Sequence, residues 1–81
     1  MSSARNRLER YPRLAELSEA RKRAEALDDE GRRAATLSRI DALALFASGD
    51  AHKSIKSRTG VCRQKVTYYA KRFDEFGLME F

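Results

Sequence analysis

Hydrophobic side chains recur every three or four positions along this chain, and β-branched residues never alternate with polar ones over four positions. This spacing is typical of amphipathic helices and not of strands. Composition agrees, because the helix-forming residues Ala, Leu, Arg, Glu and Lys dominate the first half. The sequence therefore predicts an all-α fold, a small bundle of about four helices.

The first predicted helix begins near Pro12, because a proline in the first turn lacks an N–H that would have no partner there. A start one turn earlier, with a kink, is the alternative. A break is expected at residues 28–31, where Gly31 interrupts the pattern and Asp28 or Asp29 can cap the next helix. One continuous helix through this point is the other reading of the pattern. The apolar stripe of the first helix consists of Leu14, Leu17, Ala20, Ala24 and Leu27.

The second predicted helix spans about residues 32–48 and carries apolar groups on two sides. Leu45 and Phe46 point away from its main apolar face. A helix of this kind must be covered on both sides, so we expect it to lie between the N-terminal helix and the C-terminal helices. Gly49 suits the position after its end. The main face consists of Thr36, Ile40, Leu43, Ala44 and Ala47.

A short third helix is expected to start with Asp50 as its N-cap and to end near Arg58. Gly60 is expected to make the turn that follows, and Ile55 and Val61 have the spacing of core residues. Together with the next helix, this segment predicts a helix-turn-helix.

The fourth predicted helix spans about residues 63–76, with Cys62 as N-cap and Gly77 as terminator. Leu78 is expected to fold back on Phe73, and the tail 78–81 to pack against the fold. On a helical wheel, one side holds Cys62, Val66, Tyr69, Ala70, Phe73 and Phe76. The opposite side holds Gln64, Thr67, Tyr68 and Lys71, with Arg63 at the edge and Lys65 and Arg72 as flanks.

The positive charge of the chain is concentrated in the predicted helix-turn-helix. Residues 51–73 carry seven Lys or Arg and no Asp or Glu, whereas the whole chain has a net charge of +5. A charge run is ordinarily a solvated face. Its coincidence with a helix-turn-helix favours double-stranded DNA as partner. By side-chain chemistry, the base contacts are expected from Arg63, Gln64, Thr67, Tyr68 and Lys71. The phosphate contacts are expected from Lys53, Lys56, Arg58, Lys65 and Arg72.

A recognisable pattern of residues runs through the second half of the chain, and it consists of Ala42–Gly49, Ile55, Thr59–Val61, Arg63, Val66, Lys71–Phe73 and Phe76–Leu78. In this pattern the chain resembles homeodomain-like helix-turn-helix domains. It is most similar to the N-terminal DNA-binding domains of mariner-superfamily insertion-sequence transposases and to related small regulators. The resemblance covers about residues 33–78 and implies that the second motif helix enters the major groove. Lys56 stands where such domains usually place alanine, and Thr59 where they place an apolar residue.

Other function classes find little support. A chain of 81 residues forms one small domain at most, and it contains no Ser/His/Asp set, no paired carboxylates and no phosphate-binding glycine loop. We expect no catalytic residue, no cofactor and no small-molecule ligand. His52 and Cys62 are single residues of their kinds, so neither a metal site nor an internal disulfide is expected. The sequence predicts neither a membrane span nor a signal peptide, hence a cytoplasmic, nucleoid-associated location.

The N-terminal segment, residues 1–31, is expected to be a basic arm followed by the amphipathic helix, and residues 32–81 the DNA-binding domain. Arg5, Arg7, Arg10 and Arg13 suit an arm in the minor groove, although such a segment is more often a solvated tail. The stripe from Leu14 to Leu27 suits a homodimer seam or core packing against the second helix, and we expect a mixture of the two, with homodimerisation through the N-terminal helices as a hypothesis.

The leading hypothesis is a sequence-specific DNA-binding protein that acts as a transcriptional regulator or a mobile-element accessory factor. The alternative is a protein-interaction module, an anti-regulator that binds its partner through the N-terminal helix and whose helix-turn-helix is degenerate. RNA binding ranks third, because only Tyr68 offers an obvious exposed stacking surface.

Overall fold

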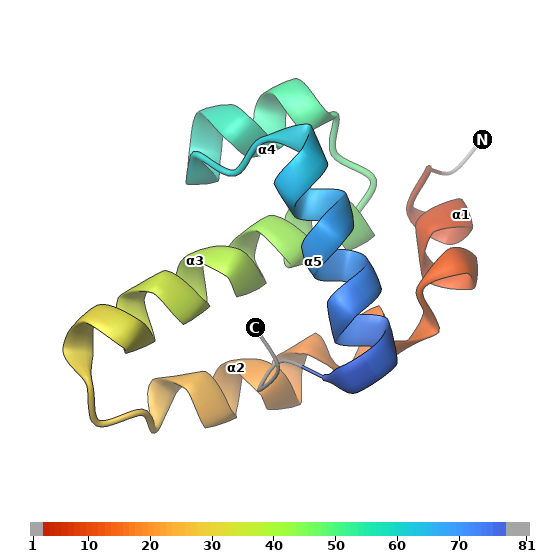
Figure 1. The fold of residues 1–81 in the computed structure, drawn as a ribbon. Coiled ribbons are helices and arrows are strands. Elements are labelled where there is room, and N and C mark those ends of the chain that lie inside the picture. Colours follow the sequence, from red (N-terminus) through yellow and green to blue (C-terminus); the bar gives the residue numbers. More distant parts are fainter. Residues whose placement is uncertain (1–2, 78–81) are drawn as a thin grey trace.

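The computed structural model describes residues 3–77, which contain helices and no strand, so the all-α prediction is confirmed (Figure 1). Five α-helices and one short 3-10 helix follow one another along this range. They are α1 (Ser3–Arg10), η1 (Pro12–Glu16), α2 (Leu17–Glu25), α3 (Glu30–Ala47), α4 (His52–Thr59) and α5 (Arg63–Phe76).

The long helix α3 is the centre of the arrangement. It contacts α1, η1, α2, α4 and α5, so the expectation that this helix is covered on two sides is confirmed. α2 runs back along α3 as an antiparallel hairpin, while α4 and α5 pack at the other end of α3 (Figure 1). α5 crosses α3 and reaches η1, which ties the C-terminal helix to the N-terminal segment.

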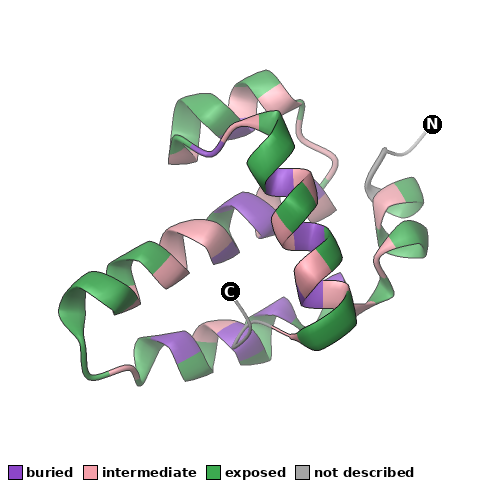
Figure 2. Cartoon of the chain, viewed as in Figure 1, coloured by how far each residue is buried: buried purple, intermediate pink, exposed green. Residues whose placement is uncertain are grey.

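The core forms where α3, α4 and α5 meet. Ile40 and Leu43 of α3, Ile55 of α4 and Val66 of α5 are completely buried. Buried positions face inward on every helix of this junction (Figure 2). The apolar stripe of the N-terminal segment joins the same cluster, so one core spans both sides of residue 31. The residues that it contributes are Leu14, Leu17, Ala20 and Ala24.

The break between α2 and α3 follows the sequence prediction. Asp29 is the N-cap of α3, and its carboxylate accepts a hydrogen bond of 2.8 Å from the backbone N–H of Arg32. This bond satisfies one of the N–H groups that a helix start leaves without a partner.

The N-terminal segment differs from the prediction, because α1 precedes Pro12. The proline ends one helix and starts another. It cannot donate an N–H to Leu8, and it disfavours helical backbone at Tyr11, whose φ is −129° and ψ 73°. The backbone N–H of Leu14 then donates to the Tyr11 carbonyl, which begins the 3-10 turn. Arg5, Arg7 and Arg10 therefore lie on a helix and not on an extended arm.

Two further predictions were wrong. The N-cap of α4 is Ala51 and not Asp50. The Asp50 carboxylate instead lies 3.9 Å from the Arg58 guanidinium. Phe76 was placed on the buried side of α5, but its side chain is 52% exposed, because it lies at the edge of the apolar arc in the last turn. The expected contact of Leu78 with Phe73 and the packing of residues 78–81 lie outside the described residues.

Gly60 makes the turn between α4 and α5 with a φ of +77°, and its N–H donates to the Lys56 carbonyl at 2.8 Å. No atom lies within 4 Å of the position that a Cβ would occupy. A side chain at residue 60 would therefore cause backbone strain without a clash.

We expect Gly60→Ala to lower the free energy of unfolding by about 1–2 kcal/mol, as measured by urea denaturation. Gly31→Ala is the matched control, because Gly31 lies in the first turn of α3 with room for a Cβ. That change should raise the free energy of unfolding by up to about 0.5–1 kcal/mol. Equal effects of the two substitutions would contradict the role of the left-handed turn.

Candidate nucleic-acid interface

The unit formed by α4, residues 60–62 and α5 is held together by apolar and polar contacts. Ile55, Val61 and Val66 are buried. The hydroxyl of Thr59 donates to the Ile55 carbonyl at 2.8 Å and accepts a bond of 3.2 Å from the backbone N–H of Val61. Thr59, which stands where the resembling domains place an apolar residue, therefore fixes the last turn of α4 to the connection.

The surface of this unit is positively charged. Lys53, Lys56, Lys65 and Lys71 are exposed, and none of them forms an ion pair with a described carboxylate. Lys56 lies on the surface and not between the helices, so its charge causes no packing conflict. Arg58 is exposed as well, and its only ion pair with a described residue is the 3.9 Å contact to Asp50.

The outer face of α5 combines polar, aromatic and basic side chains. Gln64, Tyr68 and Lys71 are exposed and follow helical spacing along one face, and Tyr68 is 57% exposed. Glu75 continues the same face in the last turn. A negative charge at this end limits any contact with a polyanion to the first two to three turns of α5.

Arg63 and Thr67 lie on the side of α5 that faces α1 and not on its outer face. Both line a groove between α5 and α1. Arg63 is exposed, whereas Thr67 is half-buried and its hydroxyl donates to the carbonyls of Arg63 and Gln64 at 2.9 and 3.1 Å. The five residues expected to contact bases thus divide between the outer face of α5 and this groove.

Arg72, expected at a phosphate, is half-buried on the flank of α5. Its guanidinium carbon lies 4.8 Å from the centre of the Phe76 ring and 5.9 Å from that of Tyr68. Arg72 therefore makes cation–π contacts with both aromatic rings.

The groove between α1 and α5 has a volume of about 220 Å³. Sequence analysis did not find it, because residues from α1 reach it only if α1 exists as a helix. The spacing of Arg7 and Arg10, one turn apart, was the available signal. The groove is lined by Asn6, Arg7, Arg10, Tyr11, Phe46, His52, Arg63 and Thr67.

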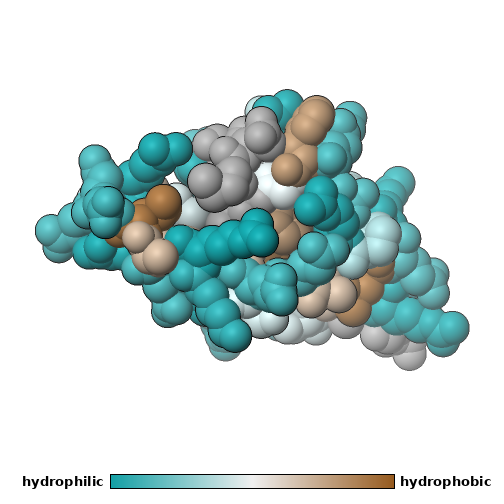
Figure 3. Space-filling model, turned by 90° about the horizontal axis from the view of Figure 1, so that it is seen from below, coloured by the Kyte–Doolittle hydropathy of each residue, from teal (hydrophilic) through white to brown (hydrophobic). Residues whose placement is uncertain are grey.

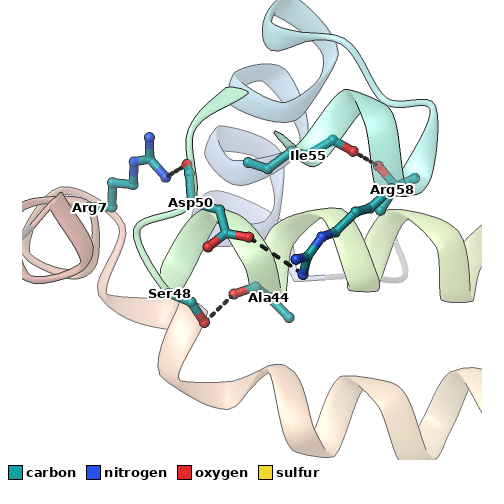
Figure 4. Close-up of polar contacts among 7 residues, drawn as sticks. Arg7, Ala44, Ser48, Asp50, Ile55 and Arg58 are labelled. Carbon is teal, nitrogen blue, oxygen red and sulfur yellow. Dashed lines mark hydrogen bonds and ion pairs between the residues drawn. The ribbon is translucent and has the colours of Figure 1, made fainter. Parts of the chain in front are cut away.

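Arg7 docks α1 onto the connection between α3 and α4 (Figure 4). Its Nη1 donates to the carbonyls of Phe46 and Asp50 at 2.8 and 2.7 Å, and its guanidinium lies 4.3 Å from the centre of the Phe46 ring. Charge-assisted hydrogen bonds of this kind are stronger than neutral ones. α1 is therefore fixed beside the start of α5.

His52, at the start of α4, lies against the Phe46 ring with 5.8 Å between ring centres. Its Nδ1 is buried without a hydrogen-bond partner among the described residues. Burial, followed by the positive charges of Arg7 and Arg63, lowers the pKa of His52 below its ordinary value of 6.5. Burial and the two neighbouring positive charges therefore both favour the neutral imidazole.

Cys62 is the N-cap of α5 and is half-buried. The geometry of its thiol does not meet that of a capping hydrogen bond, but the nearby backbone N–H of Lys65 favours the thiolate and is the main cause that lowers the pKa of Cys62. Within residues 3–77, no three His, Cys, Asp or Glu side chains form a group suited to a metal ion. In the same range no helix has the length and apolar content to cross a membrane.

Comparison of the chain with protein-family models, curated proteins and solved structures found no match. The resemblance to transposase helix-turn-helix domains therefore stays a prediction from the residues.

We expect an NMR titration of His52, the single histidine, to give a pKa below 6.5. Arg63→Ala should raise this pKa, because it removes one of the nearby positive charges. Lys65→Ala, on another side of the first turns of α5, is the control and should leave the pKa unchanged. An ordinary pKa in the unsubstituted protein would mean that His52 is neither buried nor close to Arg7 and Arg63 as described.

Proposed function

We propose that this chain binds double-stranded DNA in a sequence-dependent way, with the outer face of α5 in the major groove. The observation that carries the proposal is the surface of the unit from α4 to α5. Its lysines have no acidic partners among the described residues, and they surround exposed Gln64 and Tyr68. Lysines bind phosphates without regard to sequence, whereas a glutamine can pair with adenine.

The rigidity of the unit supports the same proposal. A helix contributes sequence preference only if its side chains keep one register against the bases. Burial of Val66, Ala70 and Phe73 fixes the rotation of α5 about its own axis, and the Thr59 hydroxyl fixes the turn before it. A transcriptional regulator or a mobile-element accessory factor is the role that we infer for such a protein.

The alternative of a protein-interaction module was based on the apolar stripe of the N-terminal helix, and most of this stripe is not exposed. Leu14, Leu17, Ala20 and Ala24 are buried in the core of the chain, and Leu27 is half-buried. The outward side of α2 belongs to a largely hydrophilic face on which the hydrophobic patches are small and separate (Figure 3). Homodimerisation stays a prediction, and it would need a surface other than this stripe.

Selection of bound sites from a random duplex pool, run at two salt concentrations, tests the proposal. Enrichment of one sequence supports it. Recovery of an unselected pool, or loss of all binding at physiological salt, would overturn sequence-dependent recognition. An RNA duplex of matching sequence is the control, because its deep and narrow major groove does not admit a helix.

On the selected site, we expect Gln64→Ala to weaken binding by about 1–3 kcal/mol and to relax the preference at one base pair. Lys53→Ala, the matched control on α4, should weaken binding to selected and random duplexes alike. Fluorescence anisotropy with both duplexes measures the two effects. The same loss on both duplexes for Gln64→Ala would contradict its contact with a base.

Binding should weaken steeply with salt. Five phosphate contacts predict a slope of about −4 to −5 in a plot of log binding constant against log salt concentration. Anisotropy titrations over a range of salt concentrations measure this slope. A slope near zero would show that the positive surface does not contact phosphates.

A further inference from the structure

We propose that the groove between α1 and α5 binds a phosphate of the DNA backbone, so that α1 is part of the DNA interface. This inference rests on the proposed function and extends it to residues outside the helix-turn-helix. It is carried by three features of the groove, which are its size, its unpaired arginines and its position beside the outer face of α5.

The groove has the size and the lining of an anion site. Its volume is about 220 Å³, and none of its lining residues is acidic. Tyr11 and Phe46, whose ring centres are 6.0 Å apart, provide an apolar wall.

Two arginines from different helices line the groove without a partner of their own. The side chains of Arg10 on α1 and Arg63 on α5 are exposed. Neither forms a hydrogen bond or an ion pair with a described side chain or carbonyl. Guanidinium groups of this kind pair with phosphate oxygens through two N–H bonds. The side-chain amide of Asn6 is a further hydrogen-bond donor in the lining.

Arg7 has a separate role in the same groove. Its Nη1 is already bound to two carbonyls, and its guanidinium covers the Phe46 ring. It therefore holds α1 at a fixed distance from α5 and contributes positive charge, without having to leave its partners to do so.

The position of the groove selects the DNA backbone as the source of the phosphate. Arg63 and Thr67 line it, while Gln64 and Lys71 on the adjacent side of α5 are exposed on the outer face. A helix in the major groove has a phosphate backbone along each flank. With the outer face of α5 toward the bases, one backbone would run along the side on which α1 lies. A free phosphate has the same chemistry, and the experiment below separates the two sources.

The first measurement compares Arg10→Ala with Arg32→Ala, an exposed arginine in the first turn of α3 that does not line the groove. Removal of one phosphate contact should make the salt slope about one unit shallower and weaken binding to all duplexes alike. Arg32→Ala should leave the slope unchanged. Arg10→Lys should keep the slope close to that of the unsubstituted protein, because it retains the positive charge. Far-UV circular dichroism checks that each variant keeps its helices.

The second measurement uses the pKa of His52, which lines the groove, as a reporter that does not depend on a substitution. The charged groups that line the groove together with the imidazole are Arg7 and Arg10 on α1 and Arg63 on α5, and burial, followed by the charges of Arg7 and Arg63, lowers its pKa. A phosphate beside these arginines should raise the pKa of His52 when a short mixed-sequence duplex is added. Inorganic phosphate at the same ionic strength is the second arm.

The outcomes distinguish the two proposals. If duplex binding persists, Arg10→Ala behaves like Arg32→Ala and the pKa of His52 does not change, the groove inference is wrong and the proposed function stands. If the unsubstituted protein binds no duplex while inorganic phosphate raises the pKa of His52, the proposed function is wrong and the groove binds a free anion. A shallower slope for Arg10→Ala together with a raised pKa in the duplex arm supports the inference.

Discussion

The contact of Ile55 and Val66 with Ile40 and Leu43 is the interaction on which the rest of the structure depends. α4 has eight residues and α5 has fourteen, and isolated helices of these lengths are marginal in water. Each of the four side chains is completely buried, and burial of such a side chain contributes about 1.5–3 kcal/mol. The rotation of α5, and with it the choice of residues on its outer face, follows from this packing.

A second constraint fixes the N-terminal helix. α1 has eight residues and ends at a proline break, so it also needs a tertiary anchor. Arg7 supplies one at the C-terminal end of α3, where the helix dipole is negative. Its bonds to the carbonyls of Phe46 and Asp50 place a positive side chain where this dipole favours it. The groove beside α5 exists because of this anchor.

Local signals in the sequence predicted much of the fold. The bounds of α5, the turn at Gly60 and the cap at Asp29 were predicted correctly, because each depends on residues close together in the chain. α1 was missed because Pro12 marks a boundary that is compatible with a helix on either side. Periodicity gave no sign that the helix before it would find a partner.

The sequence indicated only the part of the candidate site that lies within α5, because exposure along one helix depends on residues close together in the chain. Exposure of Gln64, Tyr68 and Lys71 follows from helical spacing within α5. The groove depends on Arg7 meeting Phe46, which is 39 positions away in the chain, and no local pattern encodes such a contact. Arg63 and Thr67 face α1 because core packing sets the rotation of α5 and the Arg7 contact places α1 beside it.

The distribution of ion pairs leaves most of the positive charge of residues 51–73 without a neutralising partner among the described residues. Among the described residues, Arg5, Arg13 and Arg21 pair with Glu9, Glu16 and Asp41. The segment 51–73 has no acid of its own, and its lysines lack carboxylate partners in the described range. Like charges held together on a folded surface repel one another and destabilise the compact state. A ligand that neutralises them binds the folded chain in preference to the unfolded one and so stabilises it. Under the proposed function, the segment with the densest positive charge would therefore also be the one that a phosphate backbone stabilises most.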